Sequence, residues 1–86
     1  MRLDKFLKVS RIIKRRTVAN EASDNGRVLV NDKEAKPSKE IKVNDKISVR
    51  FGDKLVSFLV LEIPFGNVSK ERAHSLYQVL DSEHLI

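Results

Sequence analysis

A dense group of basic residues near the start of the chain has the composition of a polyanion-binding segment. The stretch SRIIKRRT, residues 10–17, holds four cations in eight residues and no acid. Such crowding of like charge is repulsive unless a partner such as phosphate neutralises it. The first 16 residues together hold one acid, Asp4, and seven cations: Arg2, Lys5, Lys8, Arg11, Lys14, Arg15 and Arg16. This composition predicts an anion-binding face.

The charge is distributed unevenly along the 86 residues. Residues 1–50 hold 14 lysines and arginines against 7 acids, whereas residues 51–86 hold 3 against 5. A surface that is merely well solvated interleaves both signs. The asymmetry therefore favours a basic face for a polyanion and a near-neutral remainder.

Residues suited to catalysis or metal binding are scarce. The chain has no cysteine, and its two histidines lie ten residues apart near the end without a third ligand beside them. No glycine-rich phosphate loop and no nucleophile motif is present. Asp4 is a candidate general base, but an acid among so many cations more often aligns their side chains. We therefore expect a binding module, not an enzyme, with no cofactor and no metal.

Two short helices should position the basic residues. Leu3, Phe6 and Leu7 recur at helical spacing, which predicts a first amphipathic helix. Ile12 and Ile13 leave that stripe, so a single straight helix is not expected. The sequence instead predicts a bend or break over residues 9–13.

The second helix is predicted to begin near residues 15–17 and to run to about residue 25. Val18, Ala19 and Ala22 should face inward, where small alanines allow two helices to pack closely. Gly26 then suits a left-handed helix cap.

Alternating apolar residues after Gly26 predict strands at Val28 and Val30, at residues 47–51 and at residues 55–63. A tight turn at residues 31–33 and a loop containing Pro37 separate them.

The C-terminal part predicts a closing helix. Ser69 is a suitable N-cap, and Ala73, Leu76, Tyr77 and Leu80 follow at helical spacing. The expected fold class is α+β, in which N-terminal helices pack on a small, mostly antiparallel sheet and a C-terminal helix completes the domain.

A membrane partner is not expected. A membrane-surface helix needs a wide apolar face, and the few apolar residues of the first helix are required by the core. The longest uninterrupted apolar run, residues 58–61, is too short to span a bilayer. The charged start lacks a secretory signal, and the absence of cysteine favours a reducing cytosol.

Structured RNA is the favoured polyanion. A helix-turn-helix DNA reader presents base-reading side chains on its second helix, whereas here that helix offers Asn20, Glu21 and Ser23 and the cations precede it. This layout suits phosphates better than base edges, so DNA is not expected. An exposed aromatic platform for single strands is not expected either, because Phe6, Phe51, Phe58 and Tyr77 occupy apparent core positions.

Six segments of the chain resemble a known family. They are RLDKFL at 2–7, SR at 10–11, KRRTVANEA at 14–22, GRVLVN at 26–31, KPS at 36–38 and VNDKISV at 43–49. In order and spacing they are similar to the S-four (S4) RNA-binding domain, which also occurs in pseudouridine synthases and tyrosyl-tRNA synthetases. The resemblance covers residues 1–51. Residues 52–86, a strand and a helix, are expected to complete the same single domain.

Three positions depart from the family pattern. Asn31-Asp32 replaces the usual Asn-Gly, Asn44-Asp45 replaces Gly-Asp, and Arg15 stands where relatives often have a serine or threonine cap. Asparagine and aspartate tolerate left-handed backbone geometry, so the turns should survive. The change at Arg15 adds a cation to the basic face.

Among the free-standing members, the chain resembles the fifteen-kilodalton ribosome-associated heat-shock proteins and, more closely, the shorter ribosome quality control proteins of the RqcP family. The longer type has a basic C-terminal tail, whereas the last ten residues of this chain, YQVLDSEHLI, are not basic. The resemblance implies a cytoplasmic, ribosome-associated factor that binds large-subunit rRNA and peptidyl-tRNA after a stalled ribosome has split. It would steady P-site tRNA while an NEMF/Rqc2-type partner adds alanines to the nascent chain.

Two other functions stay open, namely an RNA-binding regulator or assembly factor acting on another structured RNA, and an enzyme with an unrecognised site.

Arg16 matches the recurrent arginine at the start of the family's second helix, where its planar fork suits a phosphate. The expected RNA-binding residues are Arg2, Asp4, Lys5, Lys8, Arg11, Lys14, Arg15, Arg16, Arg27 and Lys36.

Overall fold

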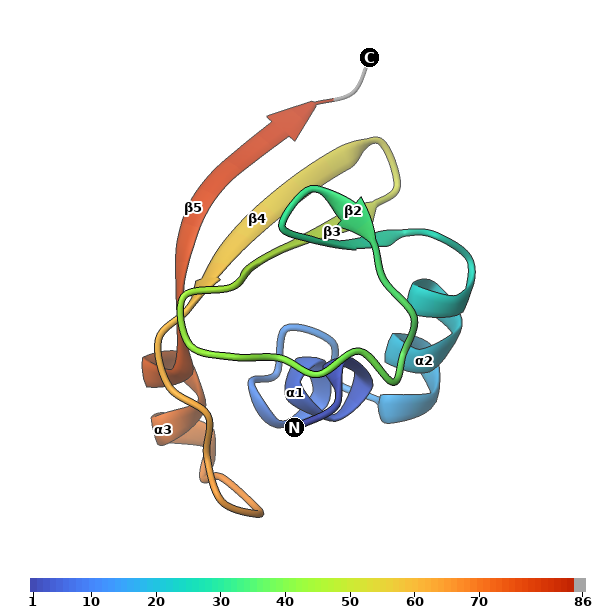
Figure 1. Cartoon of the computed structure of the whole chain (residues 1–86). Coiled ribbons are helices and arrows are strands. Elements are labelled where there is room, and N and C mark those ends of the chain that lie inside the picture. The colour runs from blue at the N-terminus through green and yellow to red at the C-terminus, as the bar shows by residue number, and fades with distance from the viewer. Residues whose placement is uncertain (85–86) are drawn as a thin grey trace.

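The computed structural model describes residues 1–84, and these form the predicted α+β fold (Figure 1). The predicted second segment, 52–86, extends two residues beyond them. Helices α1 and α2 pack on one face of a five-stranded antiparallel sheet in the order β2-β1-β3-β4-β5. The elements are α1 (Leu3–Val9), α2 (Arg16–Asp24), β1 (Val28–Val30), β2 (Lys33–Glu34), β3 (Lys46–Phe51), β4 (Lys54–Val60), α3 (Lys70–Ala73), a 3-10 turn (His74–Leu76) and β5 (Tyr77–His84).

Helix α1 is short because its apolar stripe is short. Leu3, Phe6 and Leu7 are fully buried and form the centre of the core. The helix ends at Val9, and Arg11 then adopts a left-handed backbone conformation with φ of 62°. The predicted break is confirmed.

Helix α2 buries a narrower face than predicted. Ala19 is fully buried and Ala22 is partly buried against the core, but Val18 is 48% exposed. The buried stripe instead continues from Ala19 to Ser23, one turn later, whose hydroxyl donates to the carbonyl of Ala19 at 2.8 Å. The inward placement of Val18 was therefore wrong, because this side chain lines an open hollow between α2 and the end of β3.

The turns tolerate the departures from the family pattern. Asn31 and Asp32 have φ of 52° and 71°, the left-handed pair that a tight two-residue hairpin requires. Asn44, which stands where the family usually has glycine, has φ of 76°. Each is a residue type that accepts this geometry at a modest cost.

The end of β3 differs from prediction in one side chain. Phe51 was expected in the core, but it is 42% exposed. It lies at the last position of β3, beside the turn at Gly52, where it lines an open hollow together with Val18 and Ala22 of α2. An aromatic side chain is therefore presented at the surface.

The closing helix is much shorter than predicted. Ser69 caps α3 as expected, because its hydroxyl accepts the N–H of Arg72 at 3.2 Å. The chain leaves the helix at Ala73, however, and from Tyr77 it forms the long edge strand β5 against β4. Tyr77 packs edge-on against Phe58 with ring centroids 5.3 Å apart, and Leu80 is 46% exposed. The helical placement of Tyr77 and Leu80 was wrong, since pairing with β4 prevailed over their helical spacing.

Across residues 1–84 no helix is long and apolar enough to traverse a bilayer.

Candidate nucleic-acid interface

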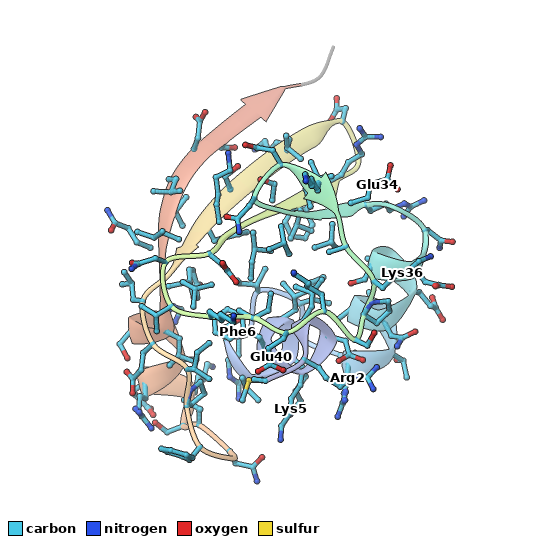
Figure 2. All side chains as sticks on the ribbon, in the orientation of Figure 1. Arg2, Lys5, Phe6, Glu34, Lys36 and Glu40 are labelled. Atoms are coloured by element: carbon cyan, nitrogen blue, oxygen red, sulfur yellow. The ribbon has the colours of Figure 1, made fainter. Side chains whose placement is uncertain are left out.

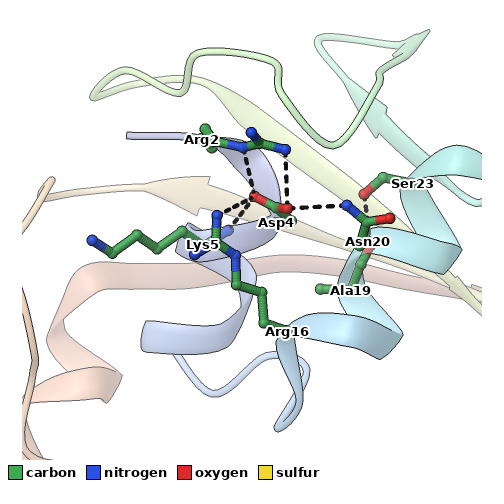
Figure 3. Close-up of polar contacts among 7 residues, drawn as sticks. All are labelled: Arg2, Asp4, Lys5, Arg16, Ala19, Asn20 and Ser23. Carbon is green, nitrogen blue, oxygen red and sulfur yellow. Dashed lines mark hydrogen bonds and ion pairs between the residues drawn. The ribbon is translucent and has the colours of Figure 1, made fainter.

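The carboxylate of Asp4 collects polar groups from both N-terminal helices (Figure 3). Arg2 donates to it from Nε at 3.2 Å and from Nη2 at 3.3 Å. Nη2 of Arg16 lies 3.5 Å from Oδ1, and Nδ2 of Asn20 donates to Oδ2 at 3.2 Å. The backbone N–H of Lys5 donates to Oδ1 at 2.8 Å. One carboxylate thus holds two guanidinium groups from different parts of the chain, and we call Arg2, Asp4, Arg16 and Asn20 the Asp4 cluster.

Burial and charge act in opposite directions on Asp4. Its side chain is 3% exposed, and this burial by itself raises the pKa of the carboxyl. Hydrogen bonds from Asn20 and Arg2, together with the positive charges of Arg16 and Arg2, outweigh it and place the pKa below its ordinary value. Asp4 is therefore ionised at neutral pH and aligns the two arginines, which is unfavourable for a general base.

The two arginines remain accessible although they contact a buried acid. The side chain of Arg2 is 50% exposed and that of Arg16 is 49% exposed. Arg16, Thr17, Asn20 and the acidic Glu21 line an open hollow of about 360 Å³ in which Asp4 also takes part. The guanidinium groups are therefore fixed on their inner side and open to solvent on the outer side.

The chain start is tied down by the loop between β2 and β3. The N–H of Leu3 donates to the carbonyl of Lys39 at 2.8 Å, and that of Asp4 donates to the carbonyl of Pro37 at 3.1 Å. Arg2 pairs with Glu40 in an isolated antiparallel bridge. The amino group of Met1 lies 2.7 Å from Oε2 of Glu40 and lowers the pKa of that carboxyl by hydrogen bonding. These contacts fix the backbone that carries Arg2.

Lys5 and Arg15 flank the Asp4 cluster without joining it. The side chain of Lys5 extends away from the carboxylate toward solvent (Figures 2 and 3). Arg15 is exposed at the N-cap position of α2 and forms no side-chain cap there. Both side chains therefore add positive charge beside the Asp4 cluster, and neither contacts the Asp4 carboxylate through its charged group.

Lys8, Arg11 and Lys14 form a second basic group at the break between the helices. They line a hollow of about 280 Å³ together with Val9, Asn67 and Val68. A left-handed backbone is uncommon for arginine and costs on the order of 1 kcal/mol or more. Arg11 nevertheless adopts it with φ of 62°, and the bend turns the chain so that the three cations surround one hollow.

Arg27 and Lys36 lie apart from the Asp4 cluster. Arg27 precedes β1, and its carbonyl accepts the N–H of Arg50 at 2.9 Å. Lys36 lies beside α2, where its Nζ is 3.9 Å from Oδ1 of Asp24 (Figure 2). Arg27 thus lies near β3, and Lys36 lies beside an acid of α2.

Two polar side chains of α2 form hydrogen bonds inside the protein and are therefore not free for base edges. Asn20 donates to Asp4, and Ser23 is buried with its hydroxyl on Ala19. Among the described residues no group of three or more potential metal ligands of the His, Cys, Asp and Glu types occurs.

Comparison with known proteins decides the family. Residues 1–47 match the S4 domain. The chain is 51% identical over 85 residues to the RQC P-site tRNA stabilizing factor of Bacillus subtilis, covering 99% of this chain and 98% of that one. It is 54% identical over 80 residues to the factor of the same name from Streptococcus pneumoniae, covering 93% and 90%. The chain belongs to the family of RQC P-site tRNA stabilizing factors.

The fold is shared with a heat-shock protein. The trimeric structure of Vibrio cholerae heat shock protein 15 superposes with a TM-score of 0.84 at 30% identity, over 93% of this chain and 81% of that one. The predicted resemblances to the ribosome quality control proteins and to the fifteen-kilodalton heat-shock proteins are therefore confirmed. In this member of the stabilizing factor family, every predicted RNA-binding residue falls within the stretch that matches the S4 domain.

Sequence reasoning missed Asn20 as a member of the Asp4 cluster. Asn20 follows Arg16 by four residues, so the two side chains share one face of α2. That spacing was a readable signal, but it pointed to a common face and not to Asp4. The sequence also did not single out Arg50 and Phe51, which are exposed at the end of β3.

Proposed function

We propose that this chain binds large ribosomal subunits that are obstructed by peptidyl-tRNA after stalling, and that it stabilises the P-site tRNA while the nascent chain receives C-terminal alanines. It acts by binding rRNA and tRNA in the cytoplasm and not by catalysis. A tailing factor of the NEMF/Rqc2 type is its expected partner. The observation that carries the proposal is the Asp4 cluster, in a chain half identical to proteins named for stabilising P-site tRNA.

The Asp4 cluster suits phosphate because each arginine keeps free donors. A guanidinium group has five N–H donors. Arg2 directs two of them at Asp4 and Arg16 directs one, so the others are available to a second anion. A guanidinium already held in place loses less rotational freedom on binding than a freely moving one. Asp4 therefore contributes to RNA affinity by positioning, while the arginines make the contact.

Stabilisation of the tRNA follows from binding by mass action. A factor that binds the subunit only when tRNA occupies the P site favours the occupied state by RT ln(1 + [L]/Kd). No bond is made or broken in this scheme. The requirement on the protein is a rigid surface that touches rRNA and tRNA at the same time, and the N-terminal helices supply the cations for it.

The first test is sedimentation of tagged protein through sucrose gradients at two salt concentrations, with the bound RNA sequenced. We expect co-migration with large subunits, enrichment of peptidyl-tRNA and loss of protein from this fraction at the higher salt. If about four to six phosphates are neutralised, log K against log salt has a slope of roughly −3 to −5. Migration at the top of the gradient, or with small RNAs only, would remove the ribosome from the proposal.

The alternative is an RNA-binding regulator or assembly factor acting on another structured RNA. It would use the same cations and show a similar salt slope. The identity of the sequenced RNA separates the two, because only the quality-control function predicts large-subunit rRNA together with peptidyl-tRNA.

A further inference from the structure

A hollow outside the Asp4 cluster combines exposed apolar side chains with cations. It has a volume of about 400 Å³ and lies where α2 meets the end of β3. Val18 and Phe51, which are 48% and 42% exposed, line it together with Ala22. Lys14, Arg27 and Arg50 line it as well. We call it the Phe51 hollow.

The charge around the Phe51 hollow is of one sign. Among the described residues that line it there are three cations and no acid. Exposed apolar residues that gather in one place and have a polar rim mark interaction sites on soluble proteins. An aliphatic or neutral partner would cover the apolar residues but leave three cations without counter-charges. The complementary occupant is apolar and flat at its centre and anionic at its edge.

We propose that the Phe51 hollow receives one unstacked nucleobase of the bound RNA, which stacks on Phe51 while the flanking phosphates contact Lys14, Arg27 and Arg50. Proteins that recognise RNA commonly stack splayed-out bases on aromatic side chains and bind the adjoining backbone with cations. The inference rests on the proposed function, because it assigns a second contact to the same RNA-bound complex.

The hollow is continuous with the basic face. Lys14 lines both the Phe51 hollow and the hollow that Lys8 and Arg11 share at the helix break. A strand that follows these cations passes from α1 around the break to the end of β3. This path accounts for Arg27, which the structure places away from the Asp4 cluster and beside Arg50.

Substitution of Phe51 separates stacking from apolar contact. Phe51→Leu keeps an apolar side chain but removes the aromatic ring, and we expect it to weaken binding to large subunits carrying peptidyl-tRNA by about 5- to 100-fold. Phe51→Tyr keeps the ring and should bind within about twofold of the unmodified chain. Leu80→Ala is the matched control, since Leu80 has a similar exposure of 46% on β5 and does not line the hollow. It should bind normally, and all three variants should keep the melting temperature.

Two further measurements identify the occupant. Ultraviolet irradiation of the complex followed by mass spectrometry should find the Phe51 peptide linked to a nucleotide. Arg50→Gln should make the salt slope shallower by about 1, whereas Lys33→Gln, on exposed β2, should leave it unchanged. A crosslink from this peptide to a protein, or equal losses for Phe51→Leu and Phe51→Tyr, would overturn the proposal.

The same assay separates failure of this inference from failure of the proposed function. Arg16 belongs to the Asp4 cluster and does not line the Phe51 hollow, so Arg16→Glu tests the cluster alone. Normal binding by Phe51→Leu with lost binding by Arg16→Glu would overturn the nucleobase site alone. Normal binding by both variants would overturn the proposed function as well.

Discussion

The N-terminal helices and the C-terminal region, which runs from β4 to β5 over residues 54–84, use charge in opposite ways. Residues 1–50 carry 14 cations and 7 acids, whereas residues 51–86 carry 3 and 5. In the helices, Arg2 and Arg16 converge on one buried carboxylate and stay half-exposed. In the C-terminal region, Arg72 of α3 pairs with Glu62 at the surface. The helices thus present cations to solvent, whereas the C-terminal region carries more acids than cations.

The C-terminal region supports the helices through packing. Phe58, Val60 and Leu76 are almost fully buried in the core that the helices cover. Burying such side chains contributes about 1.5–3 kcal/mol each relative to exposure. A small domain has little stability in excess, so the burial that this region adds helps to offset the repulsion among the cations of the helices. Substitutions in the helices should therefore change mainly binding, and substitutions in the C-terminal region should change mainly stability.

The largest effect on binding is expected at Arg16. Arg16→Glu removes a positioned guanidinium and places an anion where we expect a phosphate, so binding to large subunits should fall about 100-fold or more, or about 3 kcal/mol. Lys33→Glu makes the same charge change on β2 and should bind within about threefold. Gel-shift or pelleting assays measure both, with melting curves to show that they fold. Normal binding by a folded Arg16→Glu chain would refute the role of the helices.

The next effect is expected at Asp4, which touches both arginines. Asp4→Asn keeps the size of the side chain but removes its charge and turns an amide donor toward the donors of Arg2 and Arg16. We expect roughly tenfold weaker binding and a loss of about 1–3 kcal/mol in the free energy of unfolding, at the moderate end because both arginines are half in solvent. Urea unfolding and a binding titration measure the two effects. Unchanged binding at reduced stability would show that Asp4 is structural only.

Asp4 should also make stability depend on acid. Its folded-state pKa lies below the ordinary value of 3.8, so the ionised carboxylate stabilises the fold above that value. The contribution falls as the pH drops below 3.8 toward the folded-state pKa. The difference in unfolding free energy between the natural chain and Asp4→Asn should be constant from about pH 5 to 7 and shrink below about pH 4. A difference that grows on acidification would contradict this placement of the pKa.

A smaller loss of binding is expected at Arg11, and here the substitution should leave stability unchanged or raise it. Glycine accepts a positive φ without the steric cost that arginine incurs at 62°. Arg11→Gly should therefore leave the melting temperature unchanged or raise it, while removal of one cation weakens binding by a few-fold and makes the salt slope shallower by about 1. Tighter binding by this variant would exclude Arg11 from the interface.

The smallest effect on binding is expected in the C-terminal region. Leu76 is fully buried, and its carbonyl accepts the N–H of Leu61 at 2.8 Å. Leu76→Ala should reduce the free energy of unfolding by about 2–5 kcal/mol, while the affinity of the molecules that remain folded stays the same. Binding corrected for the folded fraction, measured at low temperature, tests this. A specific loss of affinity would place the C-terminal region in the interface.

Much of the N-terminal fold could be read from the sequence because local signals agreed with it. The spacing of Leu3, Phe6 and Leu7 gave the first helix, and the change of period after Gly26 gave β1. The closing segment could not be read in this way. Tyr77 and Leu80 fit a helical spacing. They form a strand because β5 pairs with the edge of β4, a contact that the local sequence does not show. Phe51 likewise alternates as a core residue, but it lines an open hollow beside α2 and stays 42% exposed.

The candidate site was predictable as a charge distribution but not as a geometry. The density of cations around residues 10–17 pointed to the N-terminal helices as the basic face. The convergence of Arg2 and Arg16 on Asp4 depends on how α1 and α2 pack, which no local pattern encodes. The same holds for Lys36, which lies near Asp24, and for Arg27, which lies beside the Phe51 hollow.

Lysine footprinting tests the division between the two regions most directly. The chain would be acetylated alone and in complex with large subunits carrying peptidyl-tRNA, and the reactivity of each lysine compared by mass spectrometry. We predict protection of Lys5, Lys8 and Lys14 in the complex, with Lys54 and Lys70 of the C-terminal region as reactive as in the free chain. Protection of Lys54 and Lys70 with Lys5, Lys8 and Lys14 left reactive would contradict the assignment of the RNA-binding face to the helices.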